Sequence, residues 1–104
     1  MFARQVKVRL KTDSVTEFAK IVATEVMPLL TKQAGFLDHL TLVSPDCAEA
    51  TVITFWDTMR SERTFNRGRH PEVSRSLLRV IEGQPAVNLF EVISSTFYPT
   101  IAGG

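Results

Sequence analysis

The stretch Ala50–Ile81, ATVITFWDTMRSERTFNRGRHPEVSRSLLRVI, decides the fold of this chain. Its first part, Thr51–Trp56, is β-branched and aromatic and has the length of a buried strand. Asp57 and Thr58 then offer side-chain oxygens suited to capping a helix, and helical spacing follows them with one break at Gly68. The stretch also holds the only tryptophan, one of the two histidines and six of the twelve Lys and Arg residues. It therefore predicts a strand–turn–helix unit on which any pocket chemistry is expected to draw.

Before this stretch, the sequence predicts a strand and a helix. Val6, Val8 and Leu10 alternate with polar neighbours, which is the period of a strand with one buried face. Ser14-x-x-Glu17 has the form of a capping box, in which the two side chains satisfy N–H groups of the first helical turn. The helix that follows carries one apolar face, made of Val15, Phe18, Ala19, Val22, Val26, Leu29 and Leu30.

Pro28 and Gly35 bear on the end of this helix. Pro28 lacks an N–H and is expected to bend or locally unwind the last turn. Gly35 suits the left-handed residue that ends a helix. Residues Phe36–Ser44 have β-propensity, and a turn separates them from Thr51–Trp56. The two strands are therefore expected to form an antiparallel hairpin.

Downstream, the pattern predicts the second half of a helix and a fourth strand. Pro71 suits the first position of this helical half, whose apolar stripe is Val73, Leu77, Val80 and Ile81. Gly83 is expected to close the helix, and Ala86–Ser94 to form a strand before a tail over residues 95–104. The order β-α-β-β-α-β predicts one α+β domain over residues 1–104 with a ferredoxin-like sheet and helices on one face.

The strand Thr51–Trp56 is hydrophobic on both sides. Alternation places Thr51, Ile53 and Phe55 on one face of the sheet and Val52, Thr54 and Trp56 on the other. Only one face can meet the helices, so the second face needs a partner. We expect a homodimer.

Composition excludes several classes of function. Twelve basic and eleven acidic side chains give a net charge of +1, so no overall field favours nucleic acid or a membrane surface. No run approaches the roughly 18 apolar residues of a membrane span, and the N-terminal residues do not resemble a targeting segment. A single cysteine, Cys47, excludes an internal disulfide. The expected location is the cytoplasm.

The chain resembles the antibiotic biosynthesis monooxygenase family of small dimeric α+β-barrel proteins. Nearly the whole chain takes part in the resemblance, and Phe65 lies nine residues after the tryptophan of the third strand. The other matching features are Pro28 in the first helix, Gly35-Phe36 before the second strand, Phe55-Trp56-Asp57-Thr58, His70-Pro71, and Asn88-Leu89-Phe90-Glu91-Val92.

The resemblance implies a dimeric barrel of two sheets packed back to back, with a pocket between sheet and helices in each subunit. Some members of the family oxidise aromatic polyketides or quinols with dioxygen and without metal or flavin, and others degrade haem. The pattern of the haem degraders is not met, since Val6, Asn66 and Ser76 stand at their asparagine, tryptophan and histidine positions. Trp56 matches a tryptophan of the polyketide-oxidising members, whereas Val52 stands where some of them have asparagine.

The hypothesis drawn from the sequence is a cofactor-independent monooxygenase acting on a small aromatic, polyketide or quinol substrate. His70 is the candidate base, because a neutral histidine can accept a phenolic proton near pH 7; the alternative is a helix-capping residue. Trp56 is the candidate stacking partner and N–H donor, and the alternative is a core tryptophan. A non-catalytic ligand-binding or interaction protein with the same dimeric fold is the alternative function.

Four more residues are candidates for substrate binding. Phe65 would form a wall of the pocket, and Asn66 and Arg69 would orient the ligand. His39 lies in the middle of the second strand, where a hydrogen-bonded histidine at the sheet interface is the other interpretation. No metal site is expected, because the two histidines have no carboxylate or thiol at ligand spacing. No cofactor is expected either.

Overall fold

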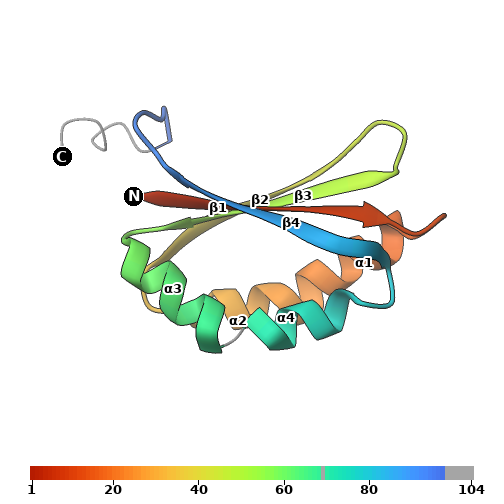
Figure 1. Ribbon diagram of the computed structural model, residues 1–104, viewed down its shortest axis with the longest axis horizontal. Helices are drawn as coiled ribbons and strands as arrows, with labels where there is room; N and C mark the ends of the chain where they lie inside the picture. Colours follow the sequence, from red (N-terminus) through yellow and green to blue (C-terminus); the bar gives the residue numbers. More distant parts are fainter. Residues whose placement is uncertain (69, 98–104) are drawn as a thin grey trace.

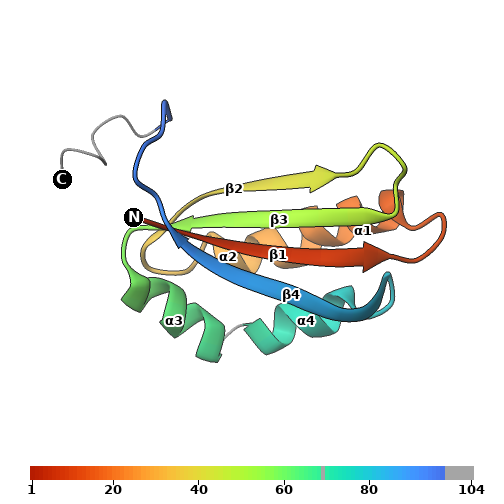
Figure 2. The same ribbon diagram turned by 45° about the horizontal axis from the view of Figure 1, so that its top comes forward.

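A four-stranded antiparallel sheet, with helices against one face, forms the framework of the molecule (Figure 1). The computed structural model describes residues 1–68 and 70–97. The strands are β1 (Phe2–Leu10), β2 (Phe36–Val43), β3 (Glu49–Trp56) and β4 (Ile81–Glu91), in the spatial order β2-β3-β1-β4. Two edge strands, β2 and β4, flank the central pair (Figure 2). The predicted ferredoxin-like α+β arrangement is confirmed.

The helical layer has two parts. The first is α1 (Val15–Ile21), a π-helical turn η1 (Val22–Val26) and α2 (Met27–Leu30); the second is α3 (Met59–Gly68) and α4 (His70–Leu77). None of the helices in the described part of the chain combines the length and apolar character needed to cross a membrane.

Strand β3 shows why the sheet has one buried face. Ala50, Thr54 and Trp56 are buried on the helical side, whereas the alternate residues Ile53 and Phe55 lie on the other side and are only half-buried. The core beneath the helices is completed by Val8, Leu10, Phe18, Ile21, Val22, Val26, Leu30, Phe65, Leu77, Val80 and Ile81. The predicted apolar faces of the first strand and helix therefore build this core.

The first helix differs from the prediction at both of its ends. Ser14 makes no side-chain cap; its hydroxyl donates to the carbonyl of Thr12 instead, so the predicted capping box is wrong. Pro28 does not unwind the last turn, which is α-helical, and the distortion is the π turn just before it. Because Pro28 has no N–H, the carbonyl four residues earlier loses its usual donor, and a wider turn is a known way to relieve this mismatch.

The second helical stripe is buried as predicted but ends sooner. Helix α4 stops at Leu77, Val80 lies in a turn, and Ile81 already belongs to β4, opposite Leu10 of β1. The N–H of Lys11 donates to the Val80 carbonyl over 2.9 Å, which ties this turn to the end of β1. The predictions that Gly83 closes the helix and that the strand begins at position 86 are therefore wrong. The spacing of Val80 and Ile81 fits either the end of a helical stripe or a turn that leads into a strand. Pairing of Ile81 with Leu10 of β1 selects the second.

Gly35 turns the chain into β2. Its φ of +82° is left-handed, as predicted, although the helix before it ends at Leu30. Its carbonyl accepts the N–H of Asp57 over 2.9 Å, so the start of β2 is tied to the end of β3. A Cβ at this position would collide with the side chains of Asp57 and Ser61. The close approach of the α3 N-terminus therefore requires glycine here.

Candidate functional site

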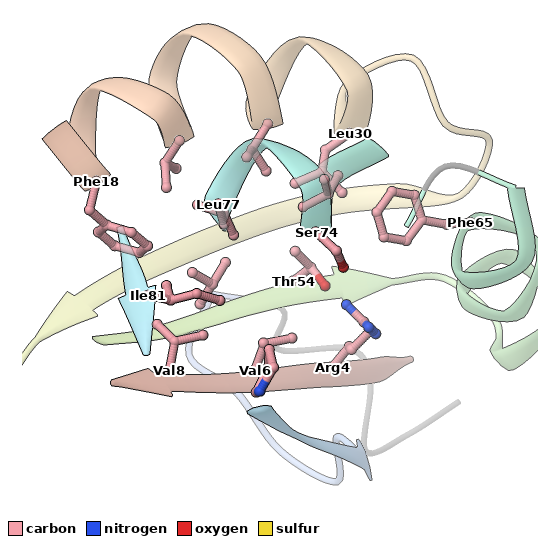
Figure 3. A pocket seen from close by; sticks show the side chains of 15 residues that line it. Arg4, Val6, Val8, Phe18, Leu30, Thr54, Phe65, Ser74, Leu77 and Ile81 are labelled. Atoms are coloured by element: carbon pink, nitrogen blue, oxygen red, sulfur yellow. The ribbon is translucent and has the colours of Figure 1, made fainter. Parts of the chain in front are cut away.

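A small apolar cavity lies between the sheet and the helices (Figure 3). It offers about 50 Å³ to the centres of water-sized molecules, which is room for a few waters. Polar side chains at its wall are Arg4, Thr54 and Ser74, and the apolar lining includes Val6, Val8, Phe18, Val22, Val26, Leu30, Val52, Phe65, Val73, Leu77 and Ile81. The cavity in this state is smaller than the roughly 150 Å³ that takes up benzene, so any aromatic ligand, of one ring or several, requires the helices to move apart.

The most unusual feature of the wall is the buried side chain of Arg4. It lies on β1 at the same parity as Val6 and Val8, so the alternation of the strand turns it toward the helices. Only 5% of its surface is exposed. Burial lowers the pKa of Arg4 while the Glu62 carboxylate raises it, and an arginine remains a cation under both influences.

Helix α3 supplies the partners of this cation. Arg4 Nε lies 3.3 Å from Glu62 Oε1, and Arg4 Nη2 donates to Asn66 Oδ1 over 3.4 Å. The guanidinium carbon lies 5.9 Å from the centre of the Phe65 ring, a distance at which the ring attracts a cation. Phe65 and Asn66 follow Glu62 by three and four residues, about one helical turn, so the three lie on one side of the helix. The Arg4–Glu62 ion pair is thus buried, has no net charge and lies beside the cavity.

The start of α3 explains how these partners are held in place. Thr58 Oγ1 accepts the N–H of Ser61 over 3.1 Å, which is the N-cap hydrogen bond predicted for Thr58. The Asp57 carboxylate accepts hydrogen bonds from Ser61 and, with a smaller effect, from Thr58, and these hydrogen bonds lower its pKa. The turn after β3 therefore fixes the first turn of α3, and with it the position of Glu62 one turn later.

Trp56 lies behind the cavity wall. It is fully buried, and its indole N–H donates to Thr54 Oγ1 over 2.9 Å. Its ring is 5.6 Å from that of Phe36 in an edge-on arrangement and 5.2 Å from that of Phe65. Thr54 and Phe65 both line the cavity, so Trp56 supports two of its walls. Because Thr54 Oγ1 accepts this hydrogen bond, its own O–H is left to donate.

The other sequence candidates are placed unequally. Phe65 lines the cavity, and Asn66 is exposed but bonded to Arg4. His39 is half-buried on the edge strand β2, opposite Thr54 in the pairing, and it is not part of the cavity lining. Arg69 and the side chain of His70 lie outside the described residues. Position 70 begins α4.

Arg4, Glu62, Thr54 and Ser74 are site residues that the sequence hypothesis missed. The signal for Arg4 was present: it occupies the apolar parity of a strand whose other members at that parity are hydrophobic. Glu62 gave a similar signal, because it lies one turn before Phe65 on α3, the helix whose aromatic residue is buried. A charge at a position that periodicity assigns to the core indicates a buried pair or a ligand site.

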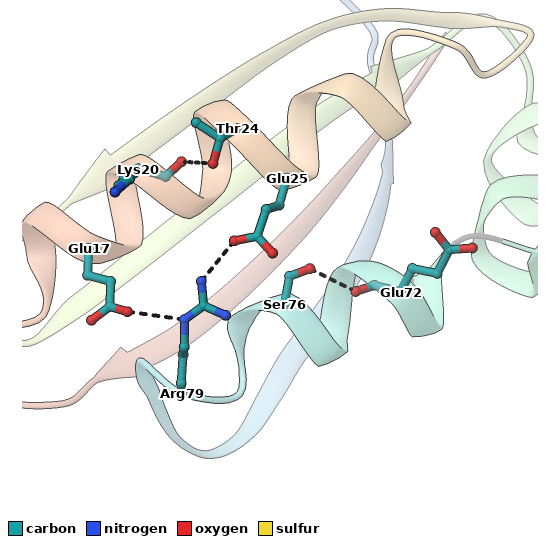
Figure 4. A network of polar contacts seen from close by, with 7 residues as sticks. All are labelled: Glu17, Lys20, Thr24, Glu25, Glu72, Ser76 and Arg79. Carbon is teal, nitrogen blue, oxygen red and sulfur yellow. Dashed lines mark hydrogen bonds and ion pairs between the residues drawn. The ribbon is translucent and has the colours of Figure 1, made fainter.

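A second polar network lies away from the cavity, on the outside of the helical layer (Figure 4). Arg79, after the end of α4, donates to Glu17 over 3.1 Å and to Glu25 over 2.8 Å. These hydrogen bonds, the one to Glu17 first, raise the pKa of Arg79. The groups are exposed, so the network joins the two helical parts without forming a desolvated site. Within residues 1–68 and 70–97, no three His, Cys, Asp or Glu side chains are grouped to hold a metal ion.

No protein-family model matches the chain, and no curated protein matches it. Solved structures do match. A monooxygenase, ActVA-Orf6 of Streptomyces coelicolor in complex with nanaomycin D, is 16% identical, with 90% of this chain and 88% of that chain covered and a TM-score of 0.79. SnoaB of Streptomyces nogalater, a cofactor-independent oxygenase, is 15% identical over 91% of this chain and 95% of its own, with a TM-score of 0.76.

A protein from Nitrosomonas europaea proposed to be an antibiotic biosynthesis monooxygenase is 12% identical, with 90% of this chain and 100% of that chain covered and a TM-score of 0.74. Proteins of unknown function are also among the similar structures. The resemblance to this family is thus confirmed at the level of the fold. At such identities the likeness shows the shared fold alone.

Proposed function

We propose that the protein is a cofactor-independent monooxygenase that oxidises a small aromatic, polyketide or quinol substrate in the cavity between sheet and helices. The observation that carries this proposal is the buried Arg4 cation at the wall of an apolar cavity. The fold is shared with SnoaB, a cofactor-independent oxygenase, and with the monooxygenase ActVA-Orf6, whose structure holds nanaomycin D. A cation in a low-dielectric site favours the anionic form of a bound ligand, and an electron-rich anion can reduce dioxygen.

The electrons of this reaction come from the substrate. When a CH₂ group activated by a ring phenolate becomes a carbonyl, one atom of dioxygen enters the product and the other leaves as water. All four electrons needed to reduce dioxygen are then supplied by the substrate carbon. The protein has to remove a proton and to stabilise the negative charge that results.

Each candidate residue has a role in this proposal. His70 is the base: position 70 begins α4, and Val73 and Ser74, which line the cavity, follow it by about one helical turn. Phe65 is a wall for the ring, and Trp56 acts through Thr54 and Phe65. Asn66 orients Arg4 by its hydrogen bond.

Arg69 and His39 are the remaining candidates for ligand binding in the same proposal. Arg69 orients the ligand through its guanidinium group. His39 contacts the substrate only if β2 and the first helix move apart, since it is outside the present lining.

The test is dioxygen uptake by metal-free protein given a panel of quinols and polycyclic phenols. We expect uptake that His70→Ala slows by about 10²–10⁴-fold, because a positioned base contributes a factor of this size. Ser76→Ala, one turn and a half along α4, is the matched control and should leave the rate unchanged. Full activity of His70→Ala would remove His70 as the base. Ligand binding without uptake across the panel would favour the alternative, a non-catalytic ligand-binding protein.

The proposal includes a homodimer in the cytoplasm. On the sheet face opposite the helices, Leu40 of β2 lies opposite Ile53 of β3. Phe55 of β3 and Phe90 of β4, which both pair with Ala3 of β1, lie on the same face. Leu40 and Phe90 are among the exposed large hydrophobic side chains. A second copy packed on this face would remove the apolar surface from water.

A further inference from the structure

We propose that Arg4 selects the ligand of this cavity by binding an ionised phenolic oxygen, so that a small phenol binds as its anion. The inference deepens the proposed function and rests on it for where the ligand binds, but it does not require oxygen chemistry. It assigns the substrate class as aromatic monoanions with a phenolate oxygen. Arg4 is then the specificity-determining residue, and Glu62 is the residue that positions it.

First, Arg4 has more N–H donors than there are acceptors around it. A guanidinium carries five N–H groups. Among the described residues, Arg4 donates one hydrogen bond, to Asn66 Oδ1 over a long 3.4 Å. Nε is buried without a hydrogen bond, although Glu62 Oε1 lies 3.3 Å away. A buried cation with unmet donors is costly, and a ligand oxygen beside it would reduce that cost.

The second step is that the polar groups lie at one end of the cavity. Figure 3 shows Arg4, Thr54 and Ser74 together near Phe65, while Phe18 and Ile81 lie at the other end. The hydroxyl of Thr54 can donate, since its oxygen already accepts the Trp56 N–H. A ligand with one oxygen at one edge and an apolar ring matches this division. The oxygen would face Arg4 and Thr54, and the ring would contact the apolar walls.

The third step concerns the charge of the ligand. Glu62 already neutralises Arg4 in sum, and both side chains are at least nine-tenths buried. Any anion therefore adds net negative charge to an apolar cavity, and a phosphate or another dianion would add two such charges, which is strongly unfavourable. A phenolate spreads one charge over its ring and oxygen and keeps an apolar body. A single ring also needs less widening of the cavity than a larger acid does.

The consequence is a shift in the acidity of the bound ligand. In this proposal the phenolic oxygen accepts the unmet N–H groups of Arg4 and so lies nearer to the cation than to the Glu62 carboxylate. These hydrogen bonds and the cation then outweigh burial and the carboxylate, and the pKa of a bound phenol should fall below that of the free phenol. We would measure this with 4-nitrophenol, whose anion absorbs visible light, by titrating pH with saturating protein. Nitrobenzene, which has nearly the same shape and no ionisable oxygen, is the neutral comparison. We expect the wild type to lower the pKa of bound nitrophenol by about one unit or more, a tenfold preference for the anion.

Two double variants test whether the pKa shift of the bound phenol comes from Arg4 and not from the cavity as a whole. Arg4→Met alone would strand the Glu62 charge, so the test variant is Arg4→Met/Glu62→Gln, which removes both charges of the buried pair. We expect this double variant to abolish the pKa shift. Its affinity for nitrobenzene should stay within about threefold of that of the wild type. The matched control is Arg79→Met/Glu17→Gln, which makes the same chemical change at the exposed pair and should retain the shift.

Three results would overturn the inference: no pKa shift in the wild type, no binding of nitrophenol, or a shift that persists in Arg4→Met/Glu62→Gln. The wild-type titration decides the first two even if that variant does not fold. Dioxygen uptake is measured separately. A preference for the anion without dioxygen uptake would refute the oxygenase and leave this inference standing. Dioxygen uptake without a preference for the anion would support the oxygenase and refute this inference.

Discussion

Arg4 and Gly35 show how single residues set the geometry of the site. Arg4 places a charge where the strand pattern calls for an apolar side chain, and α3 compensates it with Glu62 and the ring of Phe65. Gly35 leaves room for the first turn of that same helix. One residue thus supplies the charge at the cavity wall, and the other allows its partners to approach.

We expect Gly35→Ala to lower the free energy of unfolding by at least about 2 kcal/mol. The φ of +82° is strained for any residue with a Cβ, and the new methyl group would also collide with Asp57 and Ser61. Urea denaturation measures the change. Gly83→Ala is the matched control, because Gly83 has a similar φ of +69° but nothing within 4 Å of an added Cβ. Equal losses in the two variants would mean that backbone strain alone, and not the approach of α3, requires glycine at position 35.

At the scale of elements, the start of α3 determines where the partners of Arg4 lie. Thr58 caps the helix, and the buried side chains of Glu62 and Phe65 follow within two turns. We expect Thr58→Ala to cost about 1 kcal/mol of stability, because an N–H of the first turn would lose its acceptor. Chemical denaturation measures this loss. Thr64→Ala, an exposed substitution in the middle of the same helix, should change stability by less than about 0.5 kcal/mol. A neutral Thr58→Ala would show that packing alone fixes the start of α3.

The elements also show what a sequence can and cannot predict. Apolar periodicity identified which residues of the first strand and helix are buried, since burial of one face dictates the pattern. It could not place the end of α4, because Val80 and Ile81 are spaced equally well for a helical stripe and for a turn leading into a strand. Pairing with β1, a contact distant in sequence, settles that choice. Pro28 marked a distortion of the helix, but the local pattern did not place it in the preceding turn.

The site was less predictable than the fold for a related reason. Trp56 and Phe65 were identified because aromatic residues stand out in a sequence, and both lie at or behind the cavity. Arg4 was overlooked because charged residues near a chain end are usually solvated. Its burial depends on Glu62, which is 58 positions away in the chain, and no local pattern reports such a pairing.

At the scale of the whole molecule, the sheet has one covered face and one uncovered face. On the uncovered face, apolar side chains of β2, β3 and β4 lie beside the polar side chains Gln5, Lys7 and Arg9 of β1. Leu42 and Phe90 on the uncovered face are each 51% exposed. We expect sedimentation at micromolar concentration to show a dimer, twice the 11.6 kDa of the chain, because this face exposes large apolar side chains that a second copy would cover. A stable interface needs about 1,000 Å² of buried surface. Ile53→Arg should give a folded monomer, because Ile53 lies between Gln5 and Leu40 at the centre of the face and a buried unpaired charge there is costly. Leu78→Arg makes the same kind of change at an exposed residue after α4 and should remain dimeric. A well-folded wild-type monomer at these concentrations would remove the argument for the barrel, because the apolar face would then be stable in water without a second copy.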